Sequence, residues 1–148
     1  MNRLQTLATV AFSWAAFGVA TAQEEGLVPI ETLPVKAQSF IGQYFSESSI
    51  VSVWQDIDGG RVSDYTVLLA DGTEVEFRAN GEWEEVKSRN GAVSAKIVPT
   101  KISKYVRKHY PTALVKEIQK KHSKYEVKLS NGLELIFNTR GKFVKVDD

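Results

Sequence analysis

The chain contains no cysteine and only two histidines among its 148 residues. Without cysteine no disulfide can form and no thiol nucleophile is available, so packing alone must hold the fold together. His109 lies at the end of an apolar helical pattern, where a packing role is expected. His122 stands beside Ser123 in a lysine-rich turn, without the orienting acid that a catalytic triad needs. We therefore predict no catalytic residues and no enzyme activity.

Long apolar runs are also lacking, apart from one at the N-terminus. Met1–Arg3 is short and positively charged, residues 7–20 are mostly apolar, and Ala20–Ala22 reads Ala-Thr-Ala. This order predicts a signal peptide over residues 1–22, cleaved after Ala22, and a periplasmic mature protein. A retained N-terminal anchor helix is the alternative. No later segment is long and apolar enough to span a bilayer, and no cysteine follows the cleavage site to carry a lipid.

What the sequence does contain is one pattern that occurs twice. Residues 65–86 and 125–146 both read as strand, Asx-Gly turn, strand, X-Gly turn, strand. Asp71-Gly72 and Asn131-Gly132 predict hairpins with type I′ turns, which need positive φ at both central residues. A stretch with helical apolar periodicity precedes each copy. The apolar positions of these two stretches are Ala37, Phe40, Ile41 and Tyr44, then Ile102, Tyr105, Val106, His109 and Tyr110.

This repetition predicts an α+β protein made of two tandem units, each with one helix and four antiparallel strands. Residues 33–87 form the first predicted unit, and residues 98–148 form the second. Residues 23–32 are expected to be a loosely held N-terminal lead, and residues 88–97 a linker. Neither unit is large enough to fold well alone, so we expect one shared core. The units would form a continuous sheet of about eight strands, with both helices on one face and the other face open.

The ordered doubling of these motifs resembles the PepSY-like family of exported proteins, also described as beta-lactamase-inhibitor-protein-like and found mainly in Bacteroides-type bacteria. The resemblance spans residues 33–146. The motifs that carry it are Leu33-Pro34 and Val98-Pro99, the helix ends Tyr44-Phe45 and His109-Tyr110-Pro111, and the Tyr-x-Val-x-Leu strands that start at Tyr65 and Tyr125. It implies a periplasmic α+β fold whose sheet presents a concave face, which in the related inhibitor grips another protein. The family has no established catalytic residues to carry over. Because the chain lacks the inhibitor's cysteines, kinship with that inhibitor is one of shape, and inhibition does not follow from the fold alone.

Charge divides the chain into two unlike halves. Residues 23–95 hold 13 acidic and 5 basic side chains, whereas residues 96–148 hold 5 acidic and 13 basic ones. Mutual attraction of the halves is one interpretation, and a partner surface at one end is the other. The second helix carries four cations opposite its apolar face: Lys101, Lys104, Arg107 and Lys108. Anionic lipid headgroups or an envelope polyanion are candidate partners for them, whereas nucleic acid is not expected of an exported, electrically balanced protein.

Four apolar residues are candidates for contacts with a partner on the open face. Trp54, Trp83 and Phe143 occupy strand positions that the core alternation does not clearly claim. Ile136 has the opposite parity to Leu135 and is expected to point to the open face. Exposed aromatics on a rigid sheet are frequent interface anchors. Trp83 and Phe143 recur at matching positions, which equally favours a structural role at the sheet edge or against a helix.

Three aspartates form the single candidate metal site. Asp56, Asp58 and Asp64 surround Gly59-Gly60, and an oxygen-rich loop of this kind can hold calcium. The spacing does not match an EF-hand, and a plain wide hairpin turn is the alternative. No other cofactor is predicted.

Together these patterns predict a non-enzymatic periplasmic protein that binds an envelope protein or a peptide on its open sheet face. An inhibitor or a sensor accessory would act in this way. The alternative is a calcium- or small-ligand-responsive periplasmic module that uses the three aspartates. The sequence leaves the partner and the oligomeric state open.

Overall fold

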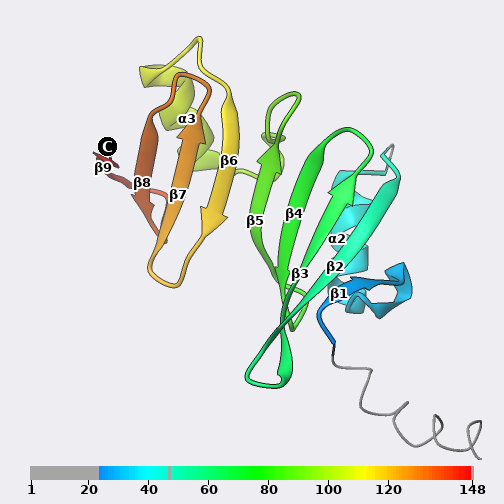
Figure 1. Cartoon of the computed structure of the whole chain (residues 1–148). Helices are drawn as coiled ribbons and strands as arrows, with labels where there is room; N and C mark the ends of the chain where they lie inside the picture. The colour runs from blue at the N-terminus through cyan, green and yellow to red at the C-terminus, as the bar shows by residue number, and fades with distance from the viewer. Residues whose placement is uncertain (1–23, 47, 148) are drawn as a thin grey trace, which may run out of the picture.

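The computed structural model describes residues 24–46 and 48–147. The predicted signal peptide and its cleavage site lie outside these residues. Within them, no helix is both long enough and apolar enough to cross a membrane. The fold is α+β, with one open antiparallel sheet and two α-helices in the described part of the chain (Figure 1).

The sheet has nine strands, and their order across the sheet follows their order along the chain. The strands are β1 (Gly26–Val28), β2 (Ile50–Asp58), β3 (Arg61–Leu69), β4 (Thr73–Arg78), β5 (Trp83–Ser88), β6 (Val115–Lys120), β7 (Lys124–Leu129), β8 (Glu134–Asn138) and β9 (Phe143–Asp147). The helices are the 3₁₀ turn η2 (Ile30–Thr32), α2 (Val35–Tyr44) and α3 (Thr100–His109).

One strand more than expected is present because the N-terminal lead is not loose. Its residues Gly26–Val28 form β1, which pairs antiparallel with β2 and sets Leu27 opposite Trp54. The Gln55 amide adds a hydrogen bond of 3.0 Å from its Nε2 to the Glu24 carbonyl. Pairing with an open strand edge gives hydrogen-bond partners to backbone N–H and C=O groups that would otherwise bind water. Such pairing can order even a short segment.

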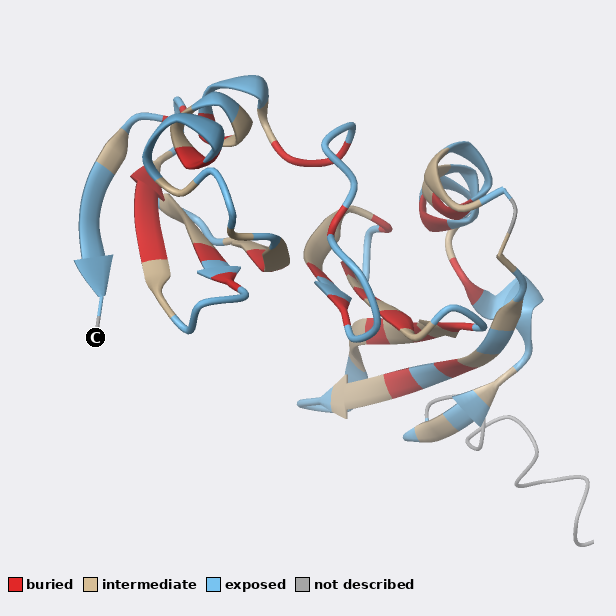
Figure 2. Ribbon diagram, turned by 90° about the horizontal axis from the view of Figure 1, so that it is seen from above, coloured by how far each residue is buried: buried red, intermediate tan, exposed pale blue. Residues whose placement is uncertain are grey.

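Both helices begin directly after a proline, Pro34 for α2 and Pro99 for α3. Proline is tolerated there because the first helical turn has no use for its missing N–H. The two helices lie on the same face of the sheet (Figure 2). Each one buries two apolar side chains in the core, Ala37 and Ile41 from α2, and Ile102 and Val106 from α3.

The core between helices and sheet is built on one row of aliphatic side chains that crosses seven strands. Cross-strand register joins its members in turn, and each is at most 2% exposed. The row consists of Val53, Val67, Val75, Val86, Ile118, Val127 and Leu135. Full burial of each such side chain stabilises the fold by about 2 kcal/mol. Because the row passes from β5 to β6 without interruption, the two halves of the sheet share this layer.

The Asx-Gly hairpins differ from the expected type I′ turns. The N–H groups of Gly72 and Gly132 donate to the carbonyls of Leu69 and Leu129, both at 3.0 Å. These glycines have φ of 87° and 90°, whereas no described residue other than glycine has positive φ. The preceding Asx residues therefore occupy type I turns that end in a glycine bulge. A three-residue connection of this kind needs only one residue with positive φ, and glycine supplies it.

The loop expected around Asp56 and Asp58 is instead part of a long hairpin. β2 runs to Asp58 and β3 starts at Arg61, so only Gly59-Gly60 connects them. Ile57 and Val62, a β-branched cross-strand pair, favour pairing close to the end of both strands.

Candidate functional site: the open face of the sheet

The face opposite α2 and α3 presents a second cross-strand row. Directly paired residues of an antiparallel sheet point to the same face, so register defines the row. It alternates with the aliphatic core row along every strand. From β1 to β9 it consists of Leu27, Trp54, Thr66, Glu76, Glu85, Gln119, Glu126, Ile136 and Lys145.

Trp54 is the large aromatic residue that this face holds toward solvent. Its side chain remains 43% exposed, and its neighbour Leu27 is 71% exposed. The indole Nε1–H donates to the Asp56 Oδ1 at 3.0 Å, which fixes the orientation of the ring. An oriented, partly exposed indole next to an exposed leucine is the kind of apolar pair that anchors interfaces.

Acidic side chains extend from this apolar pair across the N-terminal part of the face. We call Asp56, Asp64, Glu76, Glu84 and Glu85 the acidic cluster. Burial, followed by repulsion from the other four members, raises the pKa of Glu76 to about 7. Burial also raises the pKa of Asp64, and Asp56 and Glu84 add to this effect, while a hydrogen bond from Ser63 opposes it. Partial desolvation and like charge both disfavour the ionised form, so Glu76 and Asp64 lose their protons less readily than free carboxyl groups do.

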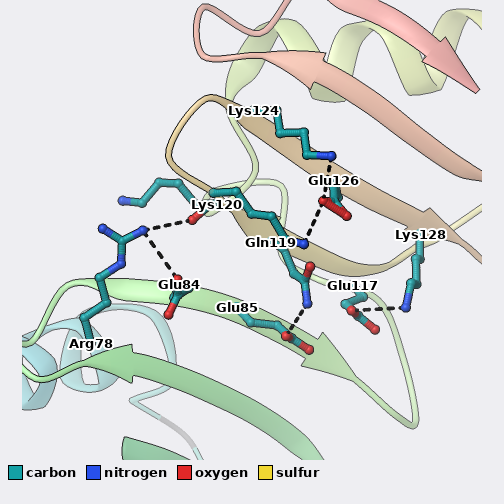
Figure 3. A network of polar contacts seen from close by, with 10 residues as sticks. Arg78, Glu84, Glu85, Glu117, Gln119, Lys120, Lys124, Glu126 and Lys128 are labelled. Atoms are coloured by element: carbon teal, nitrogen blue, oxygen red, sulfur yellow. Dashed lines mark hydrogen bonds and ion pairs between the residues drawn. The ribbon is translucent and has the colours of Figure 1, made fainter. Parts of the chain in front are cut away.

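Ion pairs and hydrogen bonds cross the junction between β5 and β6 on this face (Figure 3). The Gln119 Nε2 donates to the Glu85 Oε2 at 2.6 Å. Glu117, whose side chain is 8% exposed, lies 3.9 Å from the Lys87 Nζ and 3.5 Å from the Lys128 Nζ. Burial and then the nearby Glu85 raise the pKa of Glu117, and the two lysines counteract them. This network ties the two halves of the sheet through side chains as well as backbone.

The C-terminal part of the face carries several lysines, and acidic side chains of the same face pair with them. Lys121 and Lys124 lie 3.0 and 3.3 Å from the same oxygen of Glu126. Burial opposes ionisation of Glu126, but the two lysines outweigh it and hold the pKa of this carboxyl below its usual range. Lys145 lies 3.2 Å from Asp147. The open face therefore changes from an acidic end with an apolar anchor to an end of compensated ion pairs.

Trp83 and Phe143 do not lie on the open face. Trp83 pairs with Phe77 and lies 6.2 Å, centroid to centroid, from Phe40 of α2. Phe143 stacks on Tyr105 of α3 at 4.5 Å. One β-bulge adds Glu84 to β5, opposite the step from Glu76 to Phe77 on β4, and a second adds Val144 to β9, opposite the step from Ile136 to Phe137 on β8. The extra residue shifts the alternation of side chains between the two faces of the sheet, so both aromatic rings point to the helix side.

Ile136 does point to the open face, between Glu126 and Lys145, but it is only 4% exposed. A side chain so fully covered offers no area to a partner. Of the four candidate anchors, the structure leaves Trp54 alone exposed on this face.

The three candidate calcium ligands are not brought together. Asp56 and Asp64 are direct cross-strand partners, whereas Asp58 is paired with Arg61 at the end of the hairpin. Across residues 24–46 and 48–147, no three or more His, Cys, Asp or Glu side chains are grouped so that they could hold a metal ion.

Sequence reasoning missed Leu27 and most of the acidic cluster. Leu27 falls within the predicted loose lead, although a short apolar Leu-Val pair is itself a weak strand signal. Glu74 and Glu76 alternate with the buried Val75 and Phe77, which places them on the open face. The proximity of Glu76 to Asp64 and Glu85 depends on strand register, which the sequence alone does not fix.

This fold defines a class of α+β protein in which helices cover one sheet face and the other face stays open. The family model described as "Putative beta-lactamase-inhibitor-like, PepSY-like" matches residues 63–145, over half of the chain. The chain belongs to this PepSY-like family.

Three solved structures from Bacteroides are similar along most of their length. A putative calcium-regulated periplasmic protein from Bacteroides thetaiotaomicron is 35% identical, with a TM-score of 0.79, and the match covers 86% of this chain and 99% of that one. A putative periplasmic protein of unknown function from Bacteroides vulgatus is 34% identical, with a TM-score of 0.79 and coverage of 84% and 100%. A second putative periplasmic protein from Bacteroides vulgatus is 32% identical, with a TM-score of 0.77 and coverage of 86% and 99%. No functionally curated protein matches the chain significantly.

Proposed function

We propose that the protein is a non-enzymatic periplasmic binding protein that holds an envelope protein or a peptide on its open sheet face. An inhibitor or a sensor accessory would work in this way. The observation that carries the proposal is the exposed Trp54 beside Leu27, held in place by Asp56 on a rigid sheet. Periplasmic location is supported by the family and by the descriptions of the three similar structures.

A tandem organisation belongs to the same proposal. A signal peptide over residues 1–22 would precede a lead, a first unit at 33–87, a linker at 88–97 and a second unit at 98–148. Its support is the recurrence of one aromatic contact between helix and sheet. Phe40 of α2 meets Phe77 edge-on at 5.6 Å, and Tyr105 of α3 meets Phe137 edge-on at 5.4 Å.

The acidic cluster gives the proposed partner a chemical character. A segment that carries lysine or arginine beside an apolar side chain would place the apolar group against Trp54 and Leu27. Its cations would neutralise carboxylates such as Glu76, whose ionisation is disfavoured in the free protein. Trp83, Phe143 and Ile136 have no direct part in this contact.

Trp54→Ala is expected to abolish the contact while leaving the fold intact, because the side chain is largely outside the core. The experiment is a crosslinking pull-down from the periplasm of the native bacterium, with the exported protein as bait. Val144→Ala is the matched control, since Val144 is an exposed apolar residue on β9, at the other edge of the sheet. A dominant partner retained by Val144→Ala and lost by Trp54→Ala supports the proposal. A partner held equally well by Trp54→Ala, or no partner with the wild-type bait, contradicts it.

We infer a calcium- or small-ligand-responsive module as the second candidate. It is favoured by the description of one similar structure as calcium-regulated and by the adjacency of Asp56 and Asp64, whose repulsion a cation would relieve. The described residues do not form a ready calcium cage, so the response would require further ligands from the partner or solvent.

The second candidate makes a distinct prediction for thermal unfolding. Calcium, but not magnesium, is expected to raise the melting temperature of the wild-type protein by binding its folded state. Asp64→Asn is expected to abolish this rise, whereas Asp58→Asn, outside the adjacent pair, is expected to keep it. Identical melting curves with and without calcium would contradict the candidate.

A further inference from the structure

The outer side of α3 is a strongly basic surface. Ile102 and Val106 are buried against the sheet, whereas the cations at positions 101, 104, 107 and 108 are all exposed. At 100° per residue these four positions fall on the side of the helix opposite the core. The helix thus directs all of its charge away from the sheet.

The turn between β8 and β9 extends this surface. Gly141 lies so close to α3 that a Cβ built on it would be 3.1 Å from the Lys101 Cβ. Its neighbours Arg140 and Lys142, both exposed, therefore stand beside the first turn of the helix. We define the basic α3 face as Lys101, Lys104, Arg107, Lys108, Arg140 and Lys142.

No carboxylate in the described part of the chain lies within 4 Å of any of these six cations. The described acids after residue 96 are all on the open face, where register places them: Glu117, Glu126, Glu134 and Asp147. There Glu117, Glu126 and Asp147 pair with lysines of that face. The excess positive charge of the C-terminal half is consequently concentrated on the helix side and uncompensated.

Packing of a helix on this sheet does not require such charge. In α2 the single charged residue is Lys36, which occupies the same second position as Lys101 in α3. Lys36 is neutralised by Glu82 at 3.0 Å, and the other residues of α2 carry no charge. The positive charge of the basic α3 face is therefore not needed to pack a helix on this sheet.

An apolar feature adjoins the cations. A shallow cleft of about 150 Å³ runs from α3 to the start of β6 and is lined by Val98, Val106, Leu114 and the stem of Arg107, among others. Leu114 at its edge is 51% exposed. Arg107 of the basic α3 face shares this cleft with Leu114. A basic surface next to an exposed leucine is the combination by which peripheral proteins meet a bilayer, with charges on the headgroups and the apolar side chain at the acyl boundary. A purely ionic polyanion would have no use for Leu114.

We propose that the basic α3 face docks the protein on an anionic phospholipid surface. This inference is independent of the proposed partner contact, because the α3 face and the open face are on opposite sides of the sheet. A membrane-bound molecule would present Trp54 and the acidic cluster away from the lipid, free to meet another envelope component.

The test is sedimentation of the exported protein with vesicles, after its N-terminus has been verified by mass spectrometry so that no apolar leader remains. Vesicles of mixed phosphatidylglycerol and phosphatidylcholine are compared with vesicles of phosphatidylcholine alone, at low and high salt. The wild-type protein is expected to bind only the anionic vesicles and to be released by salt. The combined substitution of Lys101, Lys104, Arg107 and Lys108 by glutamine is expected to weaken binding at least roughly tenfold.

The matched control removes the same charge from the opposite face. It replaces Lys121, Lys124, Lys128 and Lys145 by glutamine, and melting curves verify that both variants are folded. Docking through the α3 face is supported if this control variant still binds the anionic vesicles and if Leu114→Ala, introduced into the wild-type protein, weakens vesicle binding. Equal loss in both quadruple variants, or binding to soluble heparin without binding to vesicles, would overturn the proposal.

Discussion

At the scale of single residues, Glu76 links the charge of the open face to the stability of the protein. Its pKa is raised to about 7, by burial first and by the other acidic residues second. A raised carboxyl pKa means that the folded state holds the proton more tightly than the unfolded chain. This contribution to stability is fully present below the ordinary pKa near 4.5, and it is lost as the pH rises to about 7.

Glu76→Gln is therefore expected to raise the free energy of unfolding at pH 8. The gain should be about 1 kcal/mol, well below the full value of the pKa shift, because solvent screens a side chain that is partly exposed. Below pH 4.5 the difference from wild type should vanish. Urea unfolding across this pH range measures it.

Glu134→Gln serves as the control for this prediction. Glu134 is also on the open face, but on β8, away from the acidic cluster. Its substitution is expected to leave the pH dependence of stability unchanged. If the difference in free energy of unfolding between Glu76→Gln and wild type stays constant from pH 4 to 8, ionisation of Glu76 does not destabilise the fold.

At the scale of elements, the two β-bulges decide which aromatics are structural. On β4 and β5, Glu76 pairs with Glu85 while the next residue, Phe77, pairs with Trp83, so β5 advances by two residues where β4 advances by one. The same step occurs on β9, where Val144 is the extra residue between Phe143 and Lys145. Helix and sheet are joined by rings that would otherwise point to solvent.

Phe143→Ala is accordingly expected to lower the free energy of unfolding by about 3 kcal/mol, the usual cost of removing a packed aromatic ring. The ring stacks on Tyr105 at 4.5 Å and meets Phe137 edge-on at 5.8 Å. Val144→Ala, one residue further along β9 and 56% exposed, should change stability by no more than about 0.5 kcal/mol. Similar denaturation midpoints for the two variants would argue against a structural role of Phe143.

The elements show which parts of the fold are accessible from sequence. Period-two alternation in β3 and β4 correctly predicts the buried residues Val67, Val75 and Phe77. Alternation predicts the wrong face for residues beyond a bulge that adds one residue. The sequence does not reveal such a bulge, because no particular residue type is required at that position. It also cannot show that Glu76 faces Glu85, since register is a property of paired strands. The candidate site was thus predictable in its location and in Trp54, but not in its electrostatics.

At the scale of the whole molecule, opposite charges are sorted to opposite sides as well as to opposite halves. The acidic cluster occupies the open face of β2 to β5, while the basic α3 face lies on the helix side of β6 to β9. The charge counts along the sequence showed the division between halves. The division between faces required the register that pairs the lysines of β7 and β9 with Glu117, Glu126 and Asp147.

The sequential order of the nine strands bears on how the chain folds. Every strand pairs with its neighbours in the sequence, so most pairings close only a short loop and cost little chain entropy. Folding is then expected to be fast for an antiparallel sheet of this size. The longest connection joins β5 to β6 and contains α3. These two strands are directly paired at only three positions. We therefore expect the step that joins the two halves to be the slower one in folding, which site-specific refolding kinetics would measure.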